Sequence, residues 1–574
     1  MRKQVPIVRL IGVVALLLAA SVVAISPADA REVTSEDLAK TIRWEACHED
    51  AGPNFECGTI RVPLDYDRPF GSTVELALVR LPAANPESRM GSILLNPGGP
   101  GGSGVDFALG FGPFVGQAYG QEVADKFDIV GFDPRGINRS SPVRCFSNLN
   151  RAFAAFPPLA FPLIADDIPL FEAANRELAR SCRRRAQARR VGSHASTANV
   201  AKDMDVIRAS LGDEYMNFLG LSYGTYIGAV YVNTFPERVR AVVVDGVLDP
   251  IAWVNEEAEI PFSTRLRSDK GAQDTLNEFF RQCDAAAPGA CALAPNSAER
   301  YAAVADALLG GAVPTDPVTG EPIPILYQDL IGLTLGNLYN PFGYPFLAFL
   351  IADLESLLAG SADSADGLEA SMNAARAALM VPRYENVVEG FPAVACTDTS
   401  NPKSYEAYEA AGIAADAEFG YFGRLWTWAS VPCISWPFVD RDRYEGPFDA
   451  ETANPVLVVG NFYDPATRYE GAQTLRSLLP NSGLLSVDVP GHTSLGLSIC
   501  ADTLVGQYFL NPDVANQIDG FTCPAEFNIF DLLGGPPPEA GVASSALSSS
   551  AGAQIRAAVL PEVSLVPLGA TIRD

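Results

Sequence analysis

Segments of strand length alternate with amphipathic segments along the first half of the chain. Apolar residues dominate VELALVRL (74–81), GSILLN (91–96) and FDIVGFD (127–133), and a turn-forming sequence follows each of them. These patterns predict three strands. The stretch STANVAKDMDVIRASLG (196–212) has Ser and Thr at its start, apolar residues at helical spacing and a glycine at its end. We predict a helix there.

The same alternation continues further along this half. NFLGLS (217–222) predicts a strand, YGTYIGAVYVNTF (223–235) a helix, and RAVVVDG (240–246) the next strand. Strands that alternate with helices favour a mostly parallel sheet, because each helix carries the chain back to the end where the next strand begins. The expected fold is therefore α/β, with helices on both faces of the sheet.

The pattern changes after Asp249 and Pro250. The chain becomes helical and alanine-rich, without a run of parallel-type strands, until PVLVVGNFYD (455–464) and LLSVDVPGH (484–492) resume the strand pattern. A helical insertion between two strands of a sheet predicts a lid. Its apolar segment LYNPFGYPFLAFLIADL (338–354) contains Asn, Pro and Gly, which favours a lid helix or a groove wall over a membrane span.

The two ends of the chain have different compositions. The N-terminus combines a basic start, an apolar run and the motif Ala28-Asp29-Ala30, which is typical of a secretory signal peptide, with an uncleaved membrane anchor as the alternative. The C-terminus is rich in Gly, Pro, Ala and Ser, as in a low-complexity extension. We divide the chain into a signal peptide (1–30), a first part of the core (31–250), a helical lid (251–450), a C-terminal part of the core (451–534) and a tail (535–574).

The composition excludes two classes of protein. Hydrophobic residues make up 48% of the 574 residues and charged residues 19%, so the chain can bury a sizeable core and is not mainly disordered. The formal net charge is −27, from 41 Lys and Arg against 68 Asp and Glu. Such a chain repels phosphate backbones, so we expect no nucleic-acid partner. We also expect no stable membrane insertion once the signal peptide is cleaved.

The ten cysteines all lie after the signal peptide. They are Cys47, Cys57, Cys145, Cys182, Cys283, Cys291, Cys396, Cys433, Cys500 and Cys523. Five bridges between sequence neighbours are the simplest pairing, although spacing alone does not determine connectivity. Neither C-x-x-C nor H-E-x-x-H is present, so we expect structural disulfides and no metal site. Together with the signal peptide, these cysteines predict a secreted or periplasmic protein.

The motif Gly220-Leu221-Ser222-Tyr223-Gly224 matches the nucleophile-elbow pattern G-x-S-x-G. The motif alone is a weak signal, but here a predicted strand precedes Ser222 and a predicted helix follows it. This context favours a serine held at the carboxyl edge of the sheet. The alternative is a strand–helix turn without chemistry.

A serine nucleophile needs a base, and the chain has only three histidines. His492 lies in a loop that follows a predicted strand, a position that suits a base at the sheet edge. His48 adjoins Cys47 and His194 precedes the predicted helix at 196–212. We therefore interpret His48 and His194 as surface or structural residues.

The base in turn needs a carboxylate to orient it. Asp464 ends the strand at 455–464 and begins a Pro-Ala-Thr turn, while Asp245 and Asp249 follow the preceding core strand and compete with it. We choose Asp464, because only 28 residues separate it from His492 (492 − 464). The order Ser222, Asp464, His492 also matches the chain order of α/β-hydrolases.

The glycine-rich loop NPGGPGGSG (96–104) follows an early strand, and its glycines let backbone N–H groups approach a reacting carbonyl. We expect the Gly99 amide, with Gly98 as the alternative, and the Tyr223 amide to stabilise an oxyanion. A phosphate-binding interpretation is unsupported, because neither G-x-G-x-x-G nor a P-loop lysine is present. The turn Asp133-Pro134-Arg135-Gly136 predicts a structural ion pair.

These motifs together resemble a known family. NPGGPGGSG, GFDPRG, GLSYGT, VVVDGVLDP and PVLVVGNFYDPATRYEGA are similar to segments of secreted bacterial tripeptidyl aminopeptidases and, more broadly, of prolyl-iminopeptidase-like α/β-hydrolases. The resemblance runs from Cys47 to Cys523 and is weakest in the lid. It implies an α/β-hydrolase fold with a large helical lid, and a serine exopeptidase that needs no cofactor. Pro97 stands where those enzymes usually have histidine, which weakens any claim of proline-specific cleavage.

The expected function is an exported aminopeptidase of the tripeptidyl or proline type that hydrolyses peptides from a free N-terminus through an acyl-enzyme. A carboxylesterase or lipase with the same triad is the alternative, and a non-catalytic binding protein is a third class. An aminopeptidase also needs carboxylates for the substrate ammonium group. Glu256 and Glu257 are our candidates, although an acidic cluster in so acidic a chain also suits a solvated face. Peptide length and residue preference stay open.

Overall fold

The computed structural model of the chain describes residues 33–49, 54–255, 258–361, 368, 384 and 386–533. The predicted signal peptide and the predicted tail from 535 lie outside these residues.

Strands of the described residues form one sheet of ten in the order β1-β2-β3-β5-β4-β6-β7-β8-β9-β10. All neighbours from β5 through β10 run parallel, whereas β1, β2 and β3 join antiparallel at one edge. The strands are β1 (Glu45–Ala46), β2 (Glu56–Pro63), β3 (Thr73–Leu81), β4 (Gly91–Asn96), β5 (Phe127–Phe132), β6 (Met216–Leu221), β7 (Val239–Asp245), β8 (Val456–Tyr463), β9 (Ser482–Pro490) and β10 (Phe521–Cys523). The expected α/β fold with a mostly parallel sheet is confirmed.

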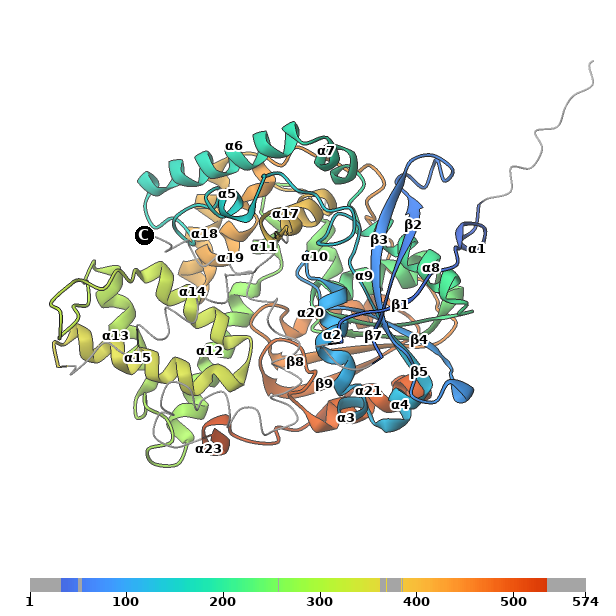
Figure 1. Cartoon of the computed structure of the whole chain (residues 1–574). Helices are drawn as coiled ribbons and strands as arrows, with labels where there is room; N and C mark the ends of the chain where they lie inside the picture. The colour runs from blue at the N-terminus through green and yellow to red at the C-terminus, as the bar shows by residue number, and fades with distance from the viewer. Residues whose placement is uncertain are drawn as a thin grey trace, which may run out of the picture.

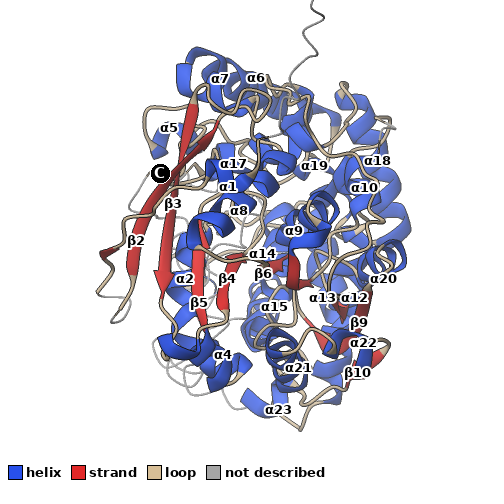
Figure 2. Ribbon diagram, turned by 90° about the vertical axis from the view of Figure 1, so that its right-hand side faces the viewer, coloured by secondary structure: helices blue, strands red, loops and turns tan. Residues whose placement is uncertain are grey.

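Alternate residues of the central strands supply two apolar cores, one on each face of the sheet. Leu219 and Val243 join one core, whereas Phe218 and Val242 join the other, as the period of two in a strand requires. Helices cover both faces in Figure 2. The first core receives α2 (Gly104–Phe111), α3 (Val115–Tyr119) and α21 (Ile499–Leu510), and the second receives α8 (Thr197–Leu211), α9 (Tyr223–Thr234) and α20 (Tyr469–Leu478).

Between β7 and β8 the described residues form helices and no strand of the sheet. These helices are α10 (Pro250–Val254), α11 (Phe262–Arg265), α12 (Ser268–Ala285), α13 (Ser297–Leu309), α14 (Tyr327–Leu338), α15 (Tyr344–Leu358), α17 (Val387–Asp398), α18 (Tyr405–Phe419) and α19 (Gly423–Ala429). Figure 1 shows most of them to the left of the strands, with α12–α15 below α17–α19. The helix α6 (Ile168–Arg184), which precedes β6 in the chain, packs with this second group, where Asn175 Nδ2 donates to Tyr405 Oη and to the Val431 carbonyl. We call the part of the chain between β7 and β8 the insertion.

One helical stretch of the described residues, Pro341–Leu358, is long and apolar enough by length and composition to cross a membrane. Half of it is buried, and Leu347, Ile351 and Leu354 of α15 belong to the first apolar core. This burial is typical of a helix packed in the interior of the protein rather than of a membrane span.

The sequence patterns missed several elements. They do not predict the strands β1, β2 and β10 or the helix α6. The other α-helices of the described residues are short: α1 (Ser35–Leu38), α4 (Gln121–Lys126), α5 (Leu149–Phe153), α7 (Ala186–Gly192), α22 (Val514–Gln517) and α23 (Ile529–Leu533). The strand β2, ECGTIRVP, has a glycine and charged residues in place of a clean alternation. Its place is set by antiparallel pairing with β3 along its whole length.

All ten cysteines lie in the described residues and form five bridges between sequence neighbours, as expected. The pairs are Cys47–Cys57, Cys145–Cys182, Cys283–Cys291, Cys396–Cys433 and Cys500–Cys523. Two of them close loops of 37 residues, for which loop-closure entropy predicts about 4 kcal/mol of stabilisation each. Bridges of this number suit an extracellular or exported protein.

We expect the unfolded, non-reduced protein to contain no reactive thiol, because every cysteine is bridged. A colorimetric thiol count in denaturant measures this, and the same count after full reduction, which should give ten, is the control. Several reactive thiols before reduction would contradict both the pairing and the export of the protein.

Candidate active site

Ser222 lies on a sharp turn between β6 and α9. Its φ of +56° is unusual for a residue other than glycine. The flanking glycines allow this turn, because a Cβ at Gly220 would come within 2.3 Å of the Gly224 carbonyl oxygen and a Cβ at Gly224 within 2.8 Å of the Asn96 carbonyl oxygen. The Ser222 N–H donates to the Asp245 carbonyl oxygen at 3.0 Å, which ties the turn to the end of β7. The G-x-S-x-G motif therefore forms the expected strand–turn–helix.

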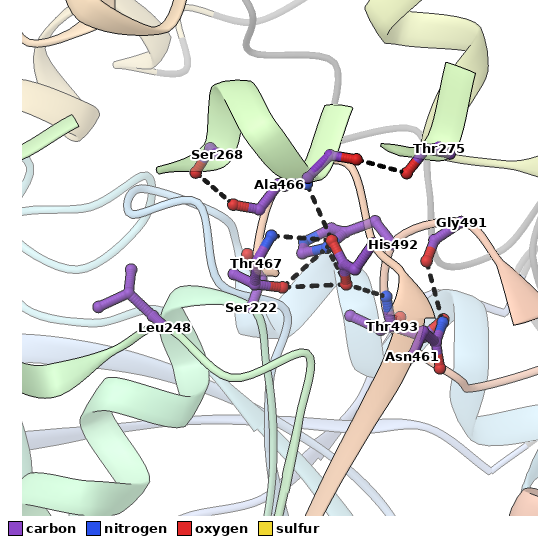
Figure 3. Close-up of polar contacts among 12 residues, drawn as sticks. Ser222, Leu248, Ser268, Thr275, Asn461, Ala466, Thr467, Gly491, His492 and Thr493 are labelled. Atoms are coloured by element: carbon purple, nitrogen blue, oxygen red, sulfur yellow. Dashed lines mark hydrogen bonds and ion pairs between the residues drawn. The ribbon is translucent and has the colours of Figure 1, made fainter. Parts of the chain in front are cut away.

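His492 and Asp464 meet at the same edge of the sheet. His492 Nδ1 lies 2.9 Å from Asp464 Oδ1 and 3.0 Å from Oδ2, and both side chains are buried. This contact leaves Nε2 as the ring atom that can exchange a proton with a substrate. Figure 3 shows His492 with its polar contacts and Ser222 in the same view.

The Asp464 carboxylate is held in place by several donors. Oδ1 accepts from the N–H groups of Ala466 and Thr467, and Oδ2 accepts from the Thr493 N–H at 3.0 Å. Burial alone would raise the pKa of Asp464, but the neighbouring His492 imidazole and these hydrogen bonds outweigh it and hold the pKa below its ordinary value. The carboxylate is therefore ionised and can orient the imidazole and stabilise the imidazolium.

Thr467 is a neighbour of this pair that the sequence analysis did not single out. Its Oγ1 donates to Asp464 Oδ2 at 3.0 Å and lies 3.2 Å from His492 Nδ1. Its signal in the sequence is the turn Asp-Pro-Ala-Thr, in which a side chain three residues after an aspartate can return to the carboxylate.

The two competing carboxylates have other partners. Asp245 accepts from the N–H groups of Ser494 and Leu495 and from Ser494 Oγ. Asp249 caps α10 by accepting from its first amides. Asp245 thus holds the backbone of the loop that carries His492, while its own carbonyl holds Ser222. The geometry favours Asp464 as the partner of the imidazole.

The insertion also contacts the loop of His492. The His492 N–H donates to the Tyr339 carbonyl oxygen at 2.9 Å, and the two rings meet edge to face with centroids 5.0 Å apart. Tyr339 follows α14, far from His492 in the chain. No pattern in the sequence indicates this contact.

The glycine-rich loop lies directly against the turn of Ser222. A Cβ at Gly98 would stand 2.5 Å from the Leu221 carbonyl oxygen and 2.9 Å from the Tyr223 nitrogen, and Gly98 has a φ of +98°. The Gly98 N–H donates to Asn96 Oδ1 at 2.9 Å. No acceptor among the described residues contacts the Gly99 or Tyr223 N–H. These two amides are therefore the better candidates for an oxyanion.

The turn 133–136 is ion-paired, but its two charged residues do not pair with each other. Asp133 accepts from Ser103 Oγ and the Arg139 N–H. Arg135 is fully buried and makes a bidentate pair with Asp203. Both residues therefore brace the loops around the site, as a structural role requires.

The remaining candidates lie elsewhere or outside the described residues. The structure does not describe Glu256 and Glu257. His48 adjoins the bridged Cys47, and His194 offers its carbonyl oxygen to Arg135.

Two clusters among the described residues have the spacing of metal ligands, and neither includes a residue of the candidate site. In the first, Cys47 and Cys57 beside His48 are bridged, so they offer no thiolate. The second is Asp65, Asp67 and Asp442, a group of acidic side chains at the surface.

The edge of the sheet thus brings together a serine on a strained turn, an imidazole oriented by a buried carboxylate, and two N–H groups that no described acceptor contacts. Such an arrangement can transfer an acyl group from an ester or amide to the serine and then to water.

Two segments of the chain match known protein families, one that begins in the first part of the core and one that ends in its C-terminal part. Residues 91–285 match the family described as alpha/beta hydrolase fold, and residues 417–523 match the family described as TAP-like protein. The chain is 33% identical over 497 residues to a Mycobacterium tuberculosis protein named serine protease Hip1, an alignment that covers 82% of this chain and 89% of that protein.

Two further relatives carry different activities in their names. The tripeptidyl aminopeptidase of Streptomyces coelicolor is 31% identical over 494 residues, with 82% of this chain and 84% of that protein covered. A Mycobacterium tuberculosis protein named carboxylesterase B is 33% identical over 499 residues, with 82% and 87% covered. Peptidase and esterase names thus occur among relatives of equal similarity.

We expect Asp464→Asn to lower kcat/KM about ten thousandfold, because a neutral amide beside Nδ1 favours the wrong imidazole tautomer. Asp245→Asn should lower it by no more than about tenfold, since the amide oxygen still accepts from the loop backbone. Hydrolysis of an activated p-nitrophenyl ester measures both, with thermal unfolding as the control for folding. Equal losses in two folded variants would contradict the division of roles between the carboxylates.

Proposed function

Because the chain belongs to the TAP-like group of the α/β-hydrolase family and is a serine hydrolase, we propose that it is an exported aminopeptidase of the tripeptidyl or proline type. The observation that carries this proposal is the contact of the His492 imidazole with Asp464 at the edge of the sheet that also holds the turn of Ser222. The Gly99 and Tyr223 N–H groups, which no acceptor in the described part of the chain contacts, lie at the same edge. Its substrates would be peptides with a free N-terminus.

The proposed reaction begins with attack of Ser222 Oγ on the scissile carbonyl carbon, while His492 Nε2 accepts the hydroxyl proton. Asp464 keeps the other ring nitrogen protonated and stabilises the imidazolium. The Gly99 and Tyr223 amides donate to the oxyanion of the tetrahedral intermediate. His492 then returns the proton to the leaving amine, and a water molecule hydrolyses the acyl-enzyme by the same steps in reverse.

Support for a peptidase comes from the relatives named serine protease and tripeptidyl aminopeptidase. The relative named carboxylesterase B favours an esterase with the same triad as the second candidate. The machinery described above serves both, so the pocket for the acyl group decides between them.

For an aminopeptidase we propose that Glu256 or Glu257 binds the substrate ammonium group. The supporting observation is their place in the chain, shortly after the end of α10. That helix begins five residues after β7 ends beside Ser222. A carboxylate at such a position could meet the amine and stop longer N-terminal extensions.

We expect Ser222→Ala to abolish nearly all turnover while leaving secretion and thermal unfolding unchanged. A low residual rate is consistent with the remaining oxyanion donors. Chromogenic amides of one, two and three residues, compared with a simple ester, measure the loss and identify the preferred substrate length. Near-full activity of the variant on any of them would refute the assignment of Ser222.

We expect acetylation of the substrate amine to lower kcat/KM about ten- to hundredfold, because it leaves the carboxylate that binds the amine without its cation. Glu256→Gln or Glu257→Gln should remove most of this discrimination and leave hydrolysis of an uncharged ester nearly unchanged. Glu259→Gln, at an exposed position of the same acidic run, is the matched control. Equal rates of the wild type on free and acetylated peptides would favour an esterase or an endopeptidase.

A further inference from the structure

A chain of buried hydrogen bonds connects Tyr223, the residue after the serine, to the insertion. The Tyr223 hydroxyl contacts Thr197 Oγ1, and Thr197 Oγ1 donates to Asp398 Oδ2 at 2.5 Å. The Thr197 N–H donates to Asp398 Oδ1 at 2.9 Å. All three side chains are buried. These hydrogen bonds therefore connect the first residue of α9, through the first residue of α8, to the last residue of α17.

The direction of these hydrogen bonds follows from the number of protons available. Above its pKa the Asp398 carboxyl is ionised and only accepts, so the single Thr197 hydroxyl proton points to Asp398. The Tyr223 hydroxyl then donates to Thr197 Oγ1. Burial raises the pKa of Asp398 to about 7, against the lowering effect of the Thr197 hydrogen bonds and with Asp440 adding to the rise. The N-terminus of α8 favours the charged form of the carboxylate.

Capping of α8 accounts for only part of these hydrogen bonds. Asp398 Oδ1 accepts from the Thr197 N–H, the first amide of α8, while a second carboxylate, Asp440, accepts from the Ser196 N–H and from Asn199 Nδ2 at the same helix end. Asp398 also accepts from the Thr197 hydroxyl, which in turn contacts the Tyr223 hydroxyl. If Tyr223 only filled an apolar core, phenylalanine would serve in its place. A buried hydroxyl and carboxylate carry a desolvation cost that a purely apolar packing avoids.

Because of the position of Tyr223, these hydrogen bonds restrict movement of its backbone amide. Its N–H is the first amide of α9, and its ring packs against Tyr226 and Trp253, with ring centroids 6.3 and 5.9 Å away. Fixing the phenol at the far end of the ring restricts rotation of the first turn of α9. That rotation would move the amide relative to Gly98, whose α-carbon region lies against the Tyr223 nitrogen.

We propose that Thr197 and Asp398 are positioning residues that act through the Tyr223 phenol to hold the Tyr223 N–H where it meets the oxyanion. This inference rests on the proposed role of that amide in acyl transfer. It makes the insertion part of the catalytic geometry and not only a cover, because Asp398 is the last residue of α17, a helix that the Cys396–Cys433 bridge ties to a later part of the insertion.

The test compares Thr197→Val with Thr197→Ser, since valine keeps the shape and serine keeps the hydroxyl. Thr197→Val should lower kcat about tenfold with little change in KM, a fraction of the hundred- to thousandfold loss expected when an oxyanion donor is removed outright. Thr197→Ser is expected to recover most of the rate. Activity is measured on p-nitrophenyl butyrate and on the chromogenic peptide amides, so that either substrate class gives a readout. Equal losses in Val and Ser, or an unchanged kcat in a folded Val variant, would overturn the proposal.

Two further variants separate positioning from stability. Tyr223→Phe and Asp398→Asn should each lower kcat, and the double variant should lose no more than the larger single loss, because both act through one chain. Losses that multiply would overturn the proposal. Asp440→Asn, at the same helix end but outside the chain, should lower the unfolding temperature without lowering kcat.

Titration of Ser222 with a fluorophosphonate normalises each rate to the folded, active fraction. If Thr197→Val does not fold, Tyr223→Phe carries the test alone, because it removes one hydroxyl and keeps the ring and the amide. Turnover that survives Ser222→Ala would refute the proposed function itself. Loss of turnover in Ser222→Ala together with an unchanged kcat in Tyr223→Phe would refute only the positioning role.

Discussion

Backbone contact at the carboxyl edge of the sheet, where no side chain fits, is the constraint on which the rest of the site depends. The turn of Ser222 requires Gly220 and Gly224, and the glycine-rich loop reaches that turn only because Gly98 has no Cβ. A methyl group at any of these positions would push apart backbone segments that now touch. The serine, the two N–H groups and the loop that carries them are therefore placed by one close-packed arrangement of backbone.

Two buried carboxylates hold different parts of the histidine loop. Asp464 holds the imidazole ring and receives enough hydrogen bonds to stay ionised in spite of its burial. Asp245 holds the backbone that follows His492 and, through its own carbonyl, the turn of Ser222. The ends of the adjacent strands β7 and β8 thus fix the serine and the base relative to each other.

The insertion contributes to this edge at three separate points. Tyr339 accepts from the His492 N–H, Gly390 lies against Gly101 of the glycine-rich loop, and Asp398 reaches Tyr223 through Thr197. These contacts come from α17 and from the turn after α14. A helical segment that touches the base, the loop and the turn can influence the rate of acyl transfer as well as the choice of substrate.

The sequence by itself determined the features that depend on local patterns. Apolar periodicity located β3 to β9, the G-x-S-x-G motif located the turn of Ser222, and the short separations of the cysteines suggested their pairing. The tertiary structure decided between residues that the local sequence pattern does not distinguish. Asp245, Asp249 and Asp464 all follow strands that end at one edge, and only the folded loop shows which carboxylate meets His492 and which holds its backbone. Tyr339 and Asp398 lie far in the chain from the residues they contact, so their roles depend on how the insertion packs, and no spacing along the sequence records that.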